Sequence, residues 1–483
     1  MTVQDRSTKS YSDLISNVEL NQYPQIKNTL FHDVTIRIAK LINIILMTVP
    51  FVFAWYTFYA DHLWVKFSMR GHWLVILLYV LLYFLIGRVY DAFKISYNSR
   101  GEMIYSQVLS LFEVNIIMYI VAWLLIRYIP YAIPVIAVFA VQVVFAIIWS
   151  FGSQSWYYRT FPANKTVVVY DMRQGISRLI DEYNLGKKFK VVAGVSVEDC
   201  ISDLSVLDDA DTVFLSGVHS HDRNIIAKYC LMHGISAFLI PRVGDLIIAG
   251  SRRTHMFHLL LLNVERYNPS FEYVIAKRLG DIVLSVIAII LFSPIILITA
   301  ICIKVEDHGP VLYKQCRLTK DGKQFDIYKF RSMKTDAEKD GVARLSTGDN
   351  DDRITKVGRI IRKVRIDELP QLFNILKGDL TIVGPRAERP ELAMEYQKEL
   401  PEFALRLQTK AGLTGYAQVY GKYNTTPYDK LLMDLMYIAN ASIFEDIRII
   451  FATVKILFLP ESTEGISEGQ TTAMENDYKE NDV

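Results

Sequence analysis

Four long apolar segments near the start of the chain constrain its fold more than any other feature. They cover residues 38–60, 73–87, 108–129 and 131–149. An α-helix needs about 20 apolar residues to cross the hydrocarbon core of a bilayer, and each segment is near that length, although the second is short. Tryptophans near the ends of the segments are typical of a membrane–water interface. The sequence therefore predicts four transmembrane helices over residues 37–150.

The charges between these segments predict their orientation. Arg88, Lys94 and Arg100 lie between the second and third segments, against Lys66 and Arg70 between the first and second. Positively charged loops favour the cytoplasm, and an even number of spans returns the chain to the side on which it began. We therefore expect residues 1–36 and the part of the chain after the four segments to be cytoplasmic.

Charge and cysteine content narrow the functional classes. The formal net charge is only +2, so no strong overall field favours nucleic acid as a partner. The four cysteines show neither the CxxC pattern nor the Cys/His spacing of a structural zinc site.

Residues 165–245 predict a separate, Rossmann-like α/β domain. Short buried strands at 166–170, 189–195, 212–215 and 236–240 alternate with helical patterns, of which 221–233 is the clearest. Such alternation is typical of an open α/β sheet. A dinucleotide-binding turn needs several glycines after the first strand, and this chain has only Gly175 there. We therefore favour a structural or regulatory domain over a cofactor-binding one.

A linker is predicted over 246–276, followed by a fifth apolar helix over 277–303. The linker mixes basic and apolar residues, which suits either a membrane surface or an edge strand. Within the helix, Pro294 removes a backbone hydrogen bond, so we expect a bend, and the hydroxyl of Ser293 can satisfy the freed carbonyl. Two interpretations remain: a kinked fifth span, or a re-entrant helix that leaves the membrane on the side from which it entered.

Residues 304–460 predict a polar domain, with an acidic, disordered tail over 461–483. Its most distinctive stretch places Asp367 and Glu368 after a cluster of four basic residues and before a Gly-Pro-Arg turn that ends at Arg386. Fixed cations suit phosphate oxygens, and adjacent carboxylates can attack phosphorus or bind a metal. The same residue types also occur on ordinary solvated helix faces.

The order of motifs in this region resembles the bacterial sugar transferase family, the polyprenyl-phosphate hexose-1-phosphate transferases. The matching motifs are KRLGD at 277–281, SP at 293–294, YKFRSM at 328–333, DRITKVGRIIRK at 352–363, DELPQLFN at 367–374, KGDLTIVGPR at 377–386 and KAGLTGYAQVYG at 410–421. The four spans and the α/β domain before them are similar to the large, multi-span members, the undecaprenyl-phosphate sugar phosphotransferases. The chain departs from the family pattern at Asp352, Ala411 and Tyr420, which leaves loop shape and sugar choice in doubt.

The resemblance implies a membrane-bound phosphotransferase. Such an enzyme moves a hexose-1-phosphate from a UDP-sugar to undecaprenyl phosphate and releases UMP, the first step of capsule, exopolysaccharide or O-antigen assembly. The resemblance implies a re-entrant helix at 277–303, a cytoplasmic catalytic domain at the bacterial inner membrane and Mg²⁺ as cofactor. It is compatible with a homo-oligomer. Glucose or galactose is the expected sugar, with N-acetylhexosamines next.

The resemblance also assigns roles to residues. Asp367 corresponds to a nucleophile that holds the sugar phosphate as an acyl phosphate in a ping-pong reaction, and Glu368 to a magnesium ligand or acid–base partner. Both carboxylates are candidate metal ligands. The other candidates are Arg362, Arg386, Lys329 and Arg331 for substrate phosphate, Lys277, Arg278 and Asp281 for lipid phosphate or the membrane boundary, Ser293 and Pro294 for the helix bend, and Gln418 for the nucleotide pocket.

Two other functions compete with this interpretation. A processive glycosyltransferase would bind its metal through a DxD motif, for which Asp349 and Asp351 are the candidates. A catalytically silent membrane scaffold or regulator of polysaccharide export would need no dyad. The sequence shows no nucleotide-sugar-binding fold before the membrane helix, which argues against the glycosyltransferase. The intact Asp367–Glu368 dyad argues against the scaffold or regulator.

Overall fold

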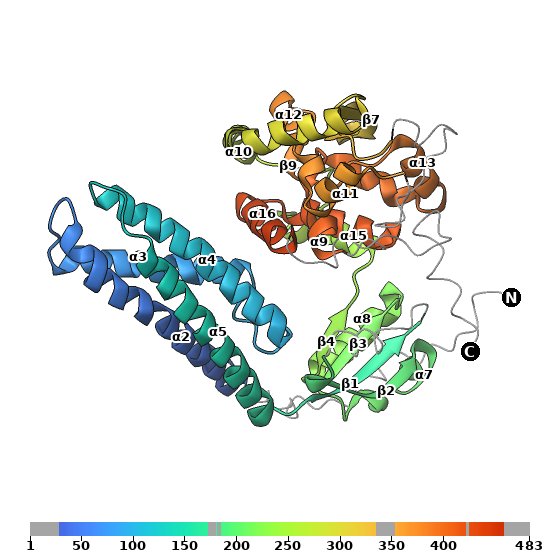
Figure 1. The fold of residues 1–483 in the computed structure, drawn as a ribbon. Helices are drawn as coiled ribbons and strands as arrows, with labels where there is room; N and C mark the ends of the chain where they lie inside the picture. The colour runs from blue at the N-terminus through green and yellow to red at the C-terminus, as the bar shows by residue number, and fades with distance from the viewer. Residues whose placement is uncertain (1–28, 172–179, 181–184, 335–352, 422–424, 458–483) are drawn as a thin grey trace. The chain divides into compact units, whose positions relative to one another are not determined.

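The computed structural model describes residues 29–171, 180, 185–334, 353–421 and 425–457 (Figure 1). The predictions for the acidic tail, for most of the N-terminal segment and for Asp349, Asp351 and Asp352 lie outside these residues. The chain forms two compact units, residues 1–240 and 241–483, which are described separately.

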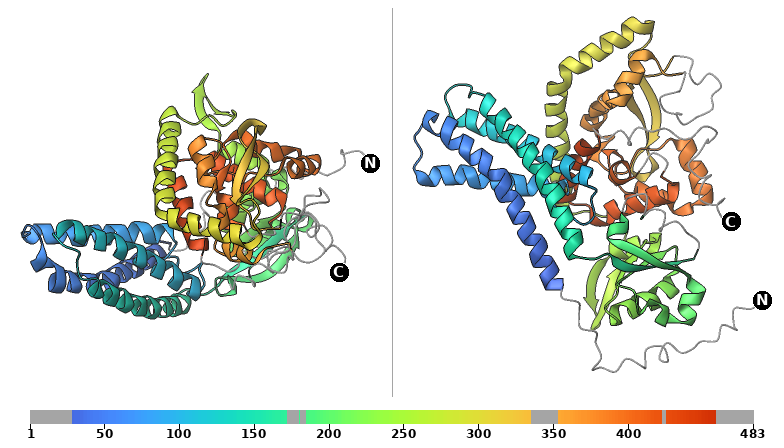
Figure 2. Two further views of the ribbon diagram at one scale, coloured as in Figure 1. Left: turned by 45° about the horizontal axis from the view of Figure 1, so that its top comes forward. Right: turned by 60° about the horizontal axis from the view of Figure 1, so that its bottom comes forward.

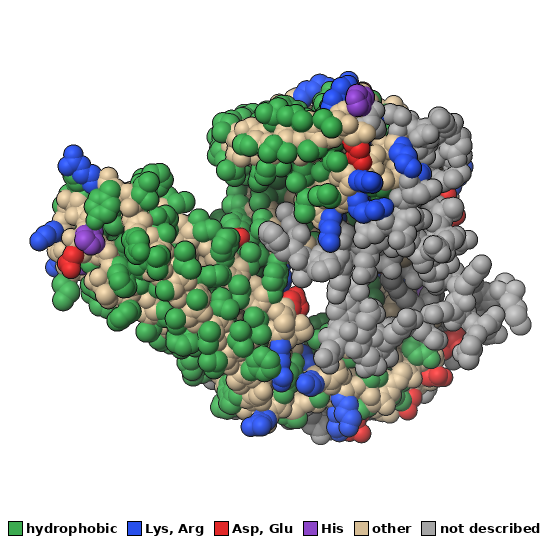
Figure 3. All heavy atoms as spheres, viewed as in Figure 1, with side chains coloured by type: hydrophobic (Ala, Val, Ile, Leu, Met, Phe, Trp, Pro, Cys, Tyr) green, Lys and Arg blue, Asp and Glu red, His purple; other side chains and the backbone are tan. Residues whose placement is uncertain are grey.

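The first unit begins with the predicted helical bundle. Its helices are α2 (Thr29–Ala54), α3 (Met69–Val89), α4 (Arg100–Leu125) and α5 (Ile133–Thr160). A π-helical turn, η1 (Trp55–Tyr59), and a 3-10 turn, η2 (Ala60–His62), extend α2. All four helices are long and apolar enough to cross a membrane. Apolar side chains cover much of their visible outer surface (Figure 3).

Polar side chains join the helices inside the bundle. Gln142 of α5 donates hydrogen bonds to the Tyr79 hydroxyl of α3 and to the Met47 carbonyl of α2, both at 2.7 Å. Its own side-chain oxygen accepts from Asn115 of α4, also at 2.7 Å. Because lipid offers no competing partners, such hydrogen bonds can hold helices together in a membrane. Gln142 therefore ties all four helices.

The α/β domain follows within the first unit, as predicted. Its strands are β1 (Asn164–Tyr170), β2 (Phe189–Ser196), β3 (Thr212–Ser216) and β4 (Ser236–Leu239), parallel throughout in the order β2-β1-β3-β4. The helices α7 (Val197–Ser202) and α8 (Ser220–Met232), with the short turns η3 (Leu185–Lys187) and η4 (Leu204–Leu207), connect them. Valine side chains of β1 are buried on both faces of the sheet, as expected for a central parallel strand.

The second unit opens with structure where a linker was predicted. Helix α9 (Val243–Ala249) precedes a hairpin of β5 (Arg252–Met256) and β6 (Leu259–Asn263). The chain reverses at Phe257 and His258, which both adopt left-handed backbone conformations, the geometry of a tight two-residue hairpin turn. Of the two interpretations left open for this stretch, a membrane-surface segment or an edge strand, the paired strands agree with the second. The turn between them was not predicted because neither of its residues is a glycine or an asparagine, the usual sequence signals for this turn.

Helix α10 (Phe271–Asp307) is longer than the predicted segment and is bent into two arms (Figure 2). The hydroxyl of Ser293 donates to the Ile290 carbonyl at 2.8 Å. That carbonyl lies four residues before Pro294, which has no N–H to offer it. The predicted compensation between Ser293 and Pro294 is therefore confirmed.

The rest of the second unit is mainly helical, with two small sheets among the described residues. The elements are β7 (Leu312–Leu318), η5 (Lys320–Gly322), β8 (Gln324–Phe330), α11 (Lys356–Lys363), η7 (Ile366–Glu368), α12 (Gln371–Lys377), β9 (Thr381–Val383), α13 (Pro390–Glu399), η8 (Pro401–Gln408), β10 (Gly412–Thr414), α14 (Tyr416–Tyr420), α15 (Pro427–Asn440) and α16 (Ile443–Leu457). Strands β7 and β8 pair antiparallel, and β9 and β10 pair parallel. Apolar clusters beneath these elements fix the loops that carry the charged residues.

Candidate active site

A sharp turn places the two adjacent carboxylates. Helix α11 ends at Lys363, and Arg365 then adopts a left-handed conformation that is uncommon for a residue other than glycine. The 3-10 turn η7 follows and holds Asp367 and Glu368 just before Pro370. The predicted position of the dyad at a helix boundary is confirmed. Asp367 is only 8% exposed, so solvent screens its charge poorly.

Three cations surround Glu368. Lys329 Nζ lies 2.7 Å from its Oε1, Arg386 Nη2 lies 3.9 Å from the same oxygen, and Arg365 Nη1 lies 3.9 Å from Oε2. Burial alone would raise the pKa of Glu368, but Lys329, Arg386 and Arg365 outweigh burial and hold that pKa well below its ordinary value. A carboxylate that stays ionised is a poor proton donor, so this geometry favours a charge-binding role over acid–base chemistry.

Asp367 has the opposite electrostatic environment. Burial and the neighbouring Glu368 charge raise the pKa of Asp367 to about 6, against the opposing effects of Lys329 and Arg362. At neutral pH the group is ionised yet more basic than an ordinary aspartate. The dyad thus consists of one strongly paired carboxylate and one basic carboxylate, a division suited to nucleophilic attack by Asp367.

Arg362 lies in the last turn of α11 near Asp367. Its Nη1 is buried and has no hydrogen-bond partner among the described residues. A buried guanidinium donor without a partner is costly, and a phosphate oxygen would satisfy it. The predicted phosphate contact of Arg362 remains a prediction that this arrangement favours.

Two of the other predicted phosphate contacts lie beside the dyad and the third lies elsewhere. Lys329 and Arg386 both contact Glu368. Arg331 is buried against the turn after α10, where a Cβ added to Gly309 would overlap its guanidinium. Strand β8 ends at Phe330, so Arg331 lies beyond the strand, and the regular alternation that would place residues 329 and 331 on the same face does not extend to it.

The residues predicted for lipid phosphate or the membrane boundary hold α10 to the rest of its unit. All three make polar contacts inside the protein. These are Lys277 Nζ with Asp446 Oδ2 at 2.7 Å, Arg278 Nη1 with the Ile375 carbonyl at 2.6 Å, and Asp281 Oδ2 with the Thr381 hydroxyl at 2.7 Å. The anchoring role is therefore visible in these contacts, whereas a contact with lipid phosphate remains a prediction.

Gln418, predicted in the nucleotide pocket, lies on α14 next to a close backbone contact. A Cβ on Gly415 would overlap the Gly384 carbonyl oxygen, so only glycine allows this approach. The Gln418 side-chain oxygen is buried without a hydrogen-bond partner among the described residues. A nucleobase N–H would satisfy this acceptor, so the nucleotide contact of Gln418 remains a prediction.

Several charged residues near the dyad were not predicted as site residues. Arg365 contacts Glu368 directly, and a second cluster lies behind Arg386. Its members are Arg317, Glu388, Arg406, Lys430 and Asp434. The sequence offers one signal for them, since Lys430 and Asp434 are one helical turn apart on α15 among apolar residues.

The dyad can hold Mg²⁺ only with help from the substrate. No cluster of three or more His, Cys, Asp or Glu residues suited to a metal occurs in the described part of the chain. The dyad supplies hard oxygen donors, but Lys329 already occupies one side of Glu368. Mg²⁺ is often held by one or two carboxylates plus phosphates and water, so the residues present fit that mode of binding.

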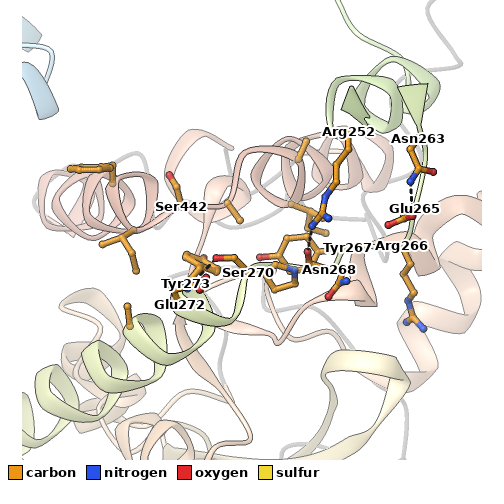
Figure 4. Close-up of a pocket in the computed structure, with 18 residues that line it drawn as sticks. Arg252, Asn263, Glu265, Arg266, Tyr267, Asn268, Ser270, Glu272, Tyr273 and Ser442 are labelled. Atoms are coloured by element: carbon orange, nitrogen blue, oxygen red, sulfur yellow. Dashed lines mark hydrogen bonds between the residues drawn. The ribbon is translucent and has the colours of Figure 1, made fainter. Parts of the chain in front are cut away.

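A cavity of about 570 Å³ lies elsewhere in the second unit (Figure 4). Arg252, Tyr267, Ser270, Tyr273 and Ser442 are among its lining residues. Its lining includes neither member of the dyad and none of the cations around Glu368. We therefore take the dyad and the cations around it, rather than this cavity, as the candidate active site.

The fold and the site together define a domain in which a long apolar helix, suited to a membrane, is joined to a carboxylate dyad surrounded by cations. A family model described as "Bacterial sugar transferase" matches residues 272–460, which includes α10 and the dyad. The exopolysaccharide production protein PSS of Rhizobium leguminosarum is 41% identical over 189 residues, which cover 37% of this chain and 94% of that protein. The chain belongs to the bacterial sugar transferase family, as its motifs predict.

Longer relatives match over nearly half of this chain. A UDP-N-acetylgalactosamine-undecaprenyl-phosphate N-acetylgalactosaminephosphotransferase of Aeromonas hydrophila is 38% identical over 49% of this chain and 55% of its own length. A UDP-glucose:undecaprenyl-phosphate glucose-1-phosphate transferase of Escherichia coli is 37% identical over 45% of this chain and 48% of its own length. The matches to these two proteins thus span about half the length of each.

Proposed function

We propose that the protein transfers a hexose-1-phosphate from a UDP-sugar to undecaprenyl phosphate and releases UMP, initiating the assembly of a capsule, exopolysaccharide or O-antigen. The main support is the geometry of the dyad: Lys329, Arg386 and Arg365 lie within 2.7 to 3.9 Å of the Glu368 carboxylate, and the adjacent Asp367 is buried. The activities for which the Aeromonas and Escherichia coli relatives are named agree with this reaction class. Those relatives differ in their sugar, so this chain's sugar is to be assigned by assay.

The proposed reaction has two steps at Asp367. A carboxylate oxygen of Asp367 attacks the sugar-bearing phosphorus, the bond from that phosphorus to the UMP oxygen breaks, and UMP carries away the electron pair. Undecaprenyl phosphate then attacks the same phosphorus and releases the Asp367 carboxylate. Arg362, with its unsatisfied buried donor, and Arg386, next to Glu368, would bind phosphate oxygens during both steps. A magnesium ion bound by Asp367 and Glu368 would neutralise diphosphate charge.

Contacts at both ends of α10 support a re-entrant helix. Near its start, Lys277 pairs with Asp446 of α16. Near its end, the Glu306 carboxylate accepts from the Lys356 backbone N–H at 2.8 Å, at the start of α11. Because one compact unit contacts both ends, both ends belong on one side of a bilayer.

The middle of α10 is suited to lipid. Ile290 and Leu291, next to the bend, are 68% and 67% exposed. Exposed apolar side chains between two protein-anchored ends are expected if the bend lies within the bilayer. This arrangement would hold Asp367 near the cytoplasmic surface of a bacterial inner membrane, within reach of a soluble UDP-sugar and of a lipid phosphate.

A product assay tests the proposal. Membranes containing the protein are incubated with labelled UDP-sugars, Mg²⁺ and undecaprenyl phosphate, and the nucleotide and lipid products are separated. We expect UMP and a sugar-diphospho-lipid, with one sugar preferred. UDP as the product would favour a processive glycosyltransferase instead, and absence of turnover with every sugar would favour a scaffold or regulator.

A further inference from the structure

A small cavity lies between the helical bundle and the α/β domain of the first unit. Its volume is about 170 Å³, which is room for several water molecules and therefore for a phosphate group. The residues that line it come from the start of α4 and the loop before it, the end of α5 and the turn η3, and they include Arg100, Tyr158 and Lys187. None of the described residues in this lining is acidic. The cavity is therefore suited to an anion.

Arg100 is the first residue of α4 and has only neutral partners among the described residues. Its Nε donates to the side-chain oxygen of Gln154 at 2.9 Å, and its guanidinium carbon lies 5.0 Å from the centre of the Phe151 ring. Glu102 belongs to the same helical turn, but it is exposed and is not part of the lining. The charge of Arg100 is therefore open to a ligand, and the N-terminus of this 26-residue helix adds a positive dipole.

Two lysines bring further positive charge from the α/β domain. Lys187 is the last residue of η3, is exposed and lines the cavity. Lys188 Nζ donates to the Ser96 hydroxyl at 3.1 Å and lies 3.0 Å from the centre of the Tyr97 ring. Neither lysine forms an ion pair with a carboxylate in the described part of the chain. Burial lowers the pKa of Lys188 to about 7, so an anion beside it would favour its charged form.

We propose that this cavity is a binding site for a phosphate group, held between Arg100 of the bundle and Lys187 of the α/β domain. The guanidinium fork of Arg100 suits two phosphate oxygens, and Lys187 adds a point charge. A phosphate bound there would tie the turn before β2 to the start of α4. The site lies in the first unit and does not depend on the reaction proposed at the dyad.

The phosphate can come from a lipid headgroup or from a soluble phosphate compound. Helices α4 and α5 are long and apolar enough to cross a membrane. Tyr97 before α4 and Trp156 near the end of α5 are 47% and 40% exposed, and exposed aromatic side chains at helix ends are typical of a membrane–water interface. The cavity is therefore at the level expected for lipid headgroups, and we expect an anionic phospholipid to bind more tightly than inorganic phosphate.

A binding experiment with two phosphate probes and one phosphate-free probe tests the site. The full-length protein in detergent is titrated by calorimetry with dihexanoyl phosphatidylglycerol, inorganic phosphate and dihexanoylglycerol, which has no phosphate. We expect phosphatidylglycerol to bind about tenfold or more tightly than dihexanoylglycerol. Lys187→Ala and Arg100→Ala should each weaken phosphatidylglycerol binding about tenfold or more, the effect of losing one charged hydrogen bond. Lys190→Ala, which removes an exposed lysine of β2 outside the lining, is the matched control and should bind as the wild type does.

Hydrogen exchange locates the bound lipid. With phosphatidylglycerol, the backbone amides of residues 97–103 and 185–190 should exchange more slowly in the wild type and in Lys190→Ala, but not in Lys187→Ala. If Arg100→Ala unfolds more easily than the wild type, Lys187→Ala carries the test, because the exposed Lys187 side chain has no partner to lose among the described residues.

The outcomes separate the two phosphate sources from the absence of a site. Inorganic phosphate that binds as tightly as the lipid, with the same loss in Lys187→Ala, would support the site and assign it to a soluble phosphate compound. Three results would overturn it: no binding of either phosphate probe, equal affinities of the wild type and Lys187→Ala, or equal binding of dihexanoylglycerol and phosphatidylglycerol.

Discussion

Two groups of buried charges in the second unit differ in whether their charges are balanced. At the start of α10, Lys277 and Asp446 pair at 2.7 Å, and the Tyr437 hydroxyl donates to the other Asp446 oxygen at 2.8 Å. Around the dyad, the buried Nη1 of Arg362 has no hydrogen-bond partner among the described residues. Three cations, Lys329, Arg386 and Arg365, lie near the Glu368 carboxylate. The balanced cluster holds a helix in place, whereas the unbalanced one retains capacity for a ligand.

The largest predicted effect follows from removing the proposed nucleophile. Asp367→Asn keeps the size of the side chain but cannot form the acyl phosphate, so we expect turnover to fall by at least about 10³-fold. The measurement is UMP release with the preferred UDP-sugar. Glu395→Gln on the exposed face of α13 is the matched control and should retain activity. An Asp367→Asn variant with more than a tenth of normal turnover would disprove the nucleophile assignment.

Breaking the balanced cluster should affect stability first. Lys277→Ala leaves Asp446 buried without its cation, and removing one partner of a buried pair typically costs about 3 kcal/mol or more. We expect a lower unfolding temperature, with activity lost in proportion to folded protein. Arg386→Ala, in the unbalanced cluster, should lower turnover with a much smaller change in unfolding temperature. If the two variants show the same pattern, the distinction between the clusters is wrong.

The pH dependence of activity should report the ionisation of Asp367. Because its folded pKa is raised to about 6, the carboxylate becomes protonated as pH falls through 6, and we expect about a tenfold loss of UMP release between pH 7 and pH 5. Protonation of Glu368 should not lower the activity further in this pH range, since the pKa of Glu368 is held well below its ordinary value. A flat profile between pH 7 and pH 5 would contradict the raised pKa.

The same shift makes a stability prediction of defined sign. A carboxyl group with a raised folded pKa binds its proton more tightly in the folded state, so its contribution to stability is lost as pH rises from about 4 through 6. Asp367→Asn removes that penalty and should raise the unfolding temperature at pH 7.5 more than at pH 5. An equal gain at both pH values would indicate a change in packing instead.

The sequence predicted those features that depend on local pattern. Apolar runs predicted the helices of the bundle, and the motif order predicted the family and the dyad. The position of Arg331 and the partners of Lys277 depend on long-range packing, which no local pattern encodes. A strand was one of two interpretations for the stretch of β5 and β6, but the hairpin turn was not predicted because neither Phe257 nor His258 is a usual turn residue. The cluster around Lys430 joins segments over a hundred residues apart in sequence, from Arg317 to Asp434.

The smallest effect concerns the bend in α10. Ser293→Ala removes the hydroxyl that satisfies the Ile290 carbonyl, and we expect a loss of about 1 kcal/mol in unfolding free energy. Ser285→Ala on the same helix is the control, because the buried Ser285 hydroxyl has no hydrogen-bond partner among the described residues. In a Pro294→Ala background the restored N–H can bond to Ile290 itself, so the serine substitution should then have little effect. Equal losses in both backgrounds would show that Ser293 does not compensate for Pro294.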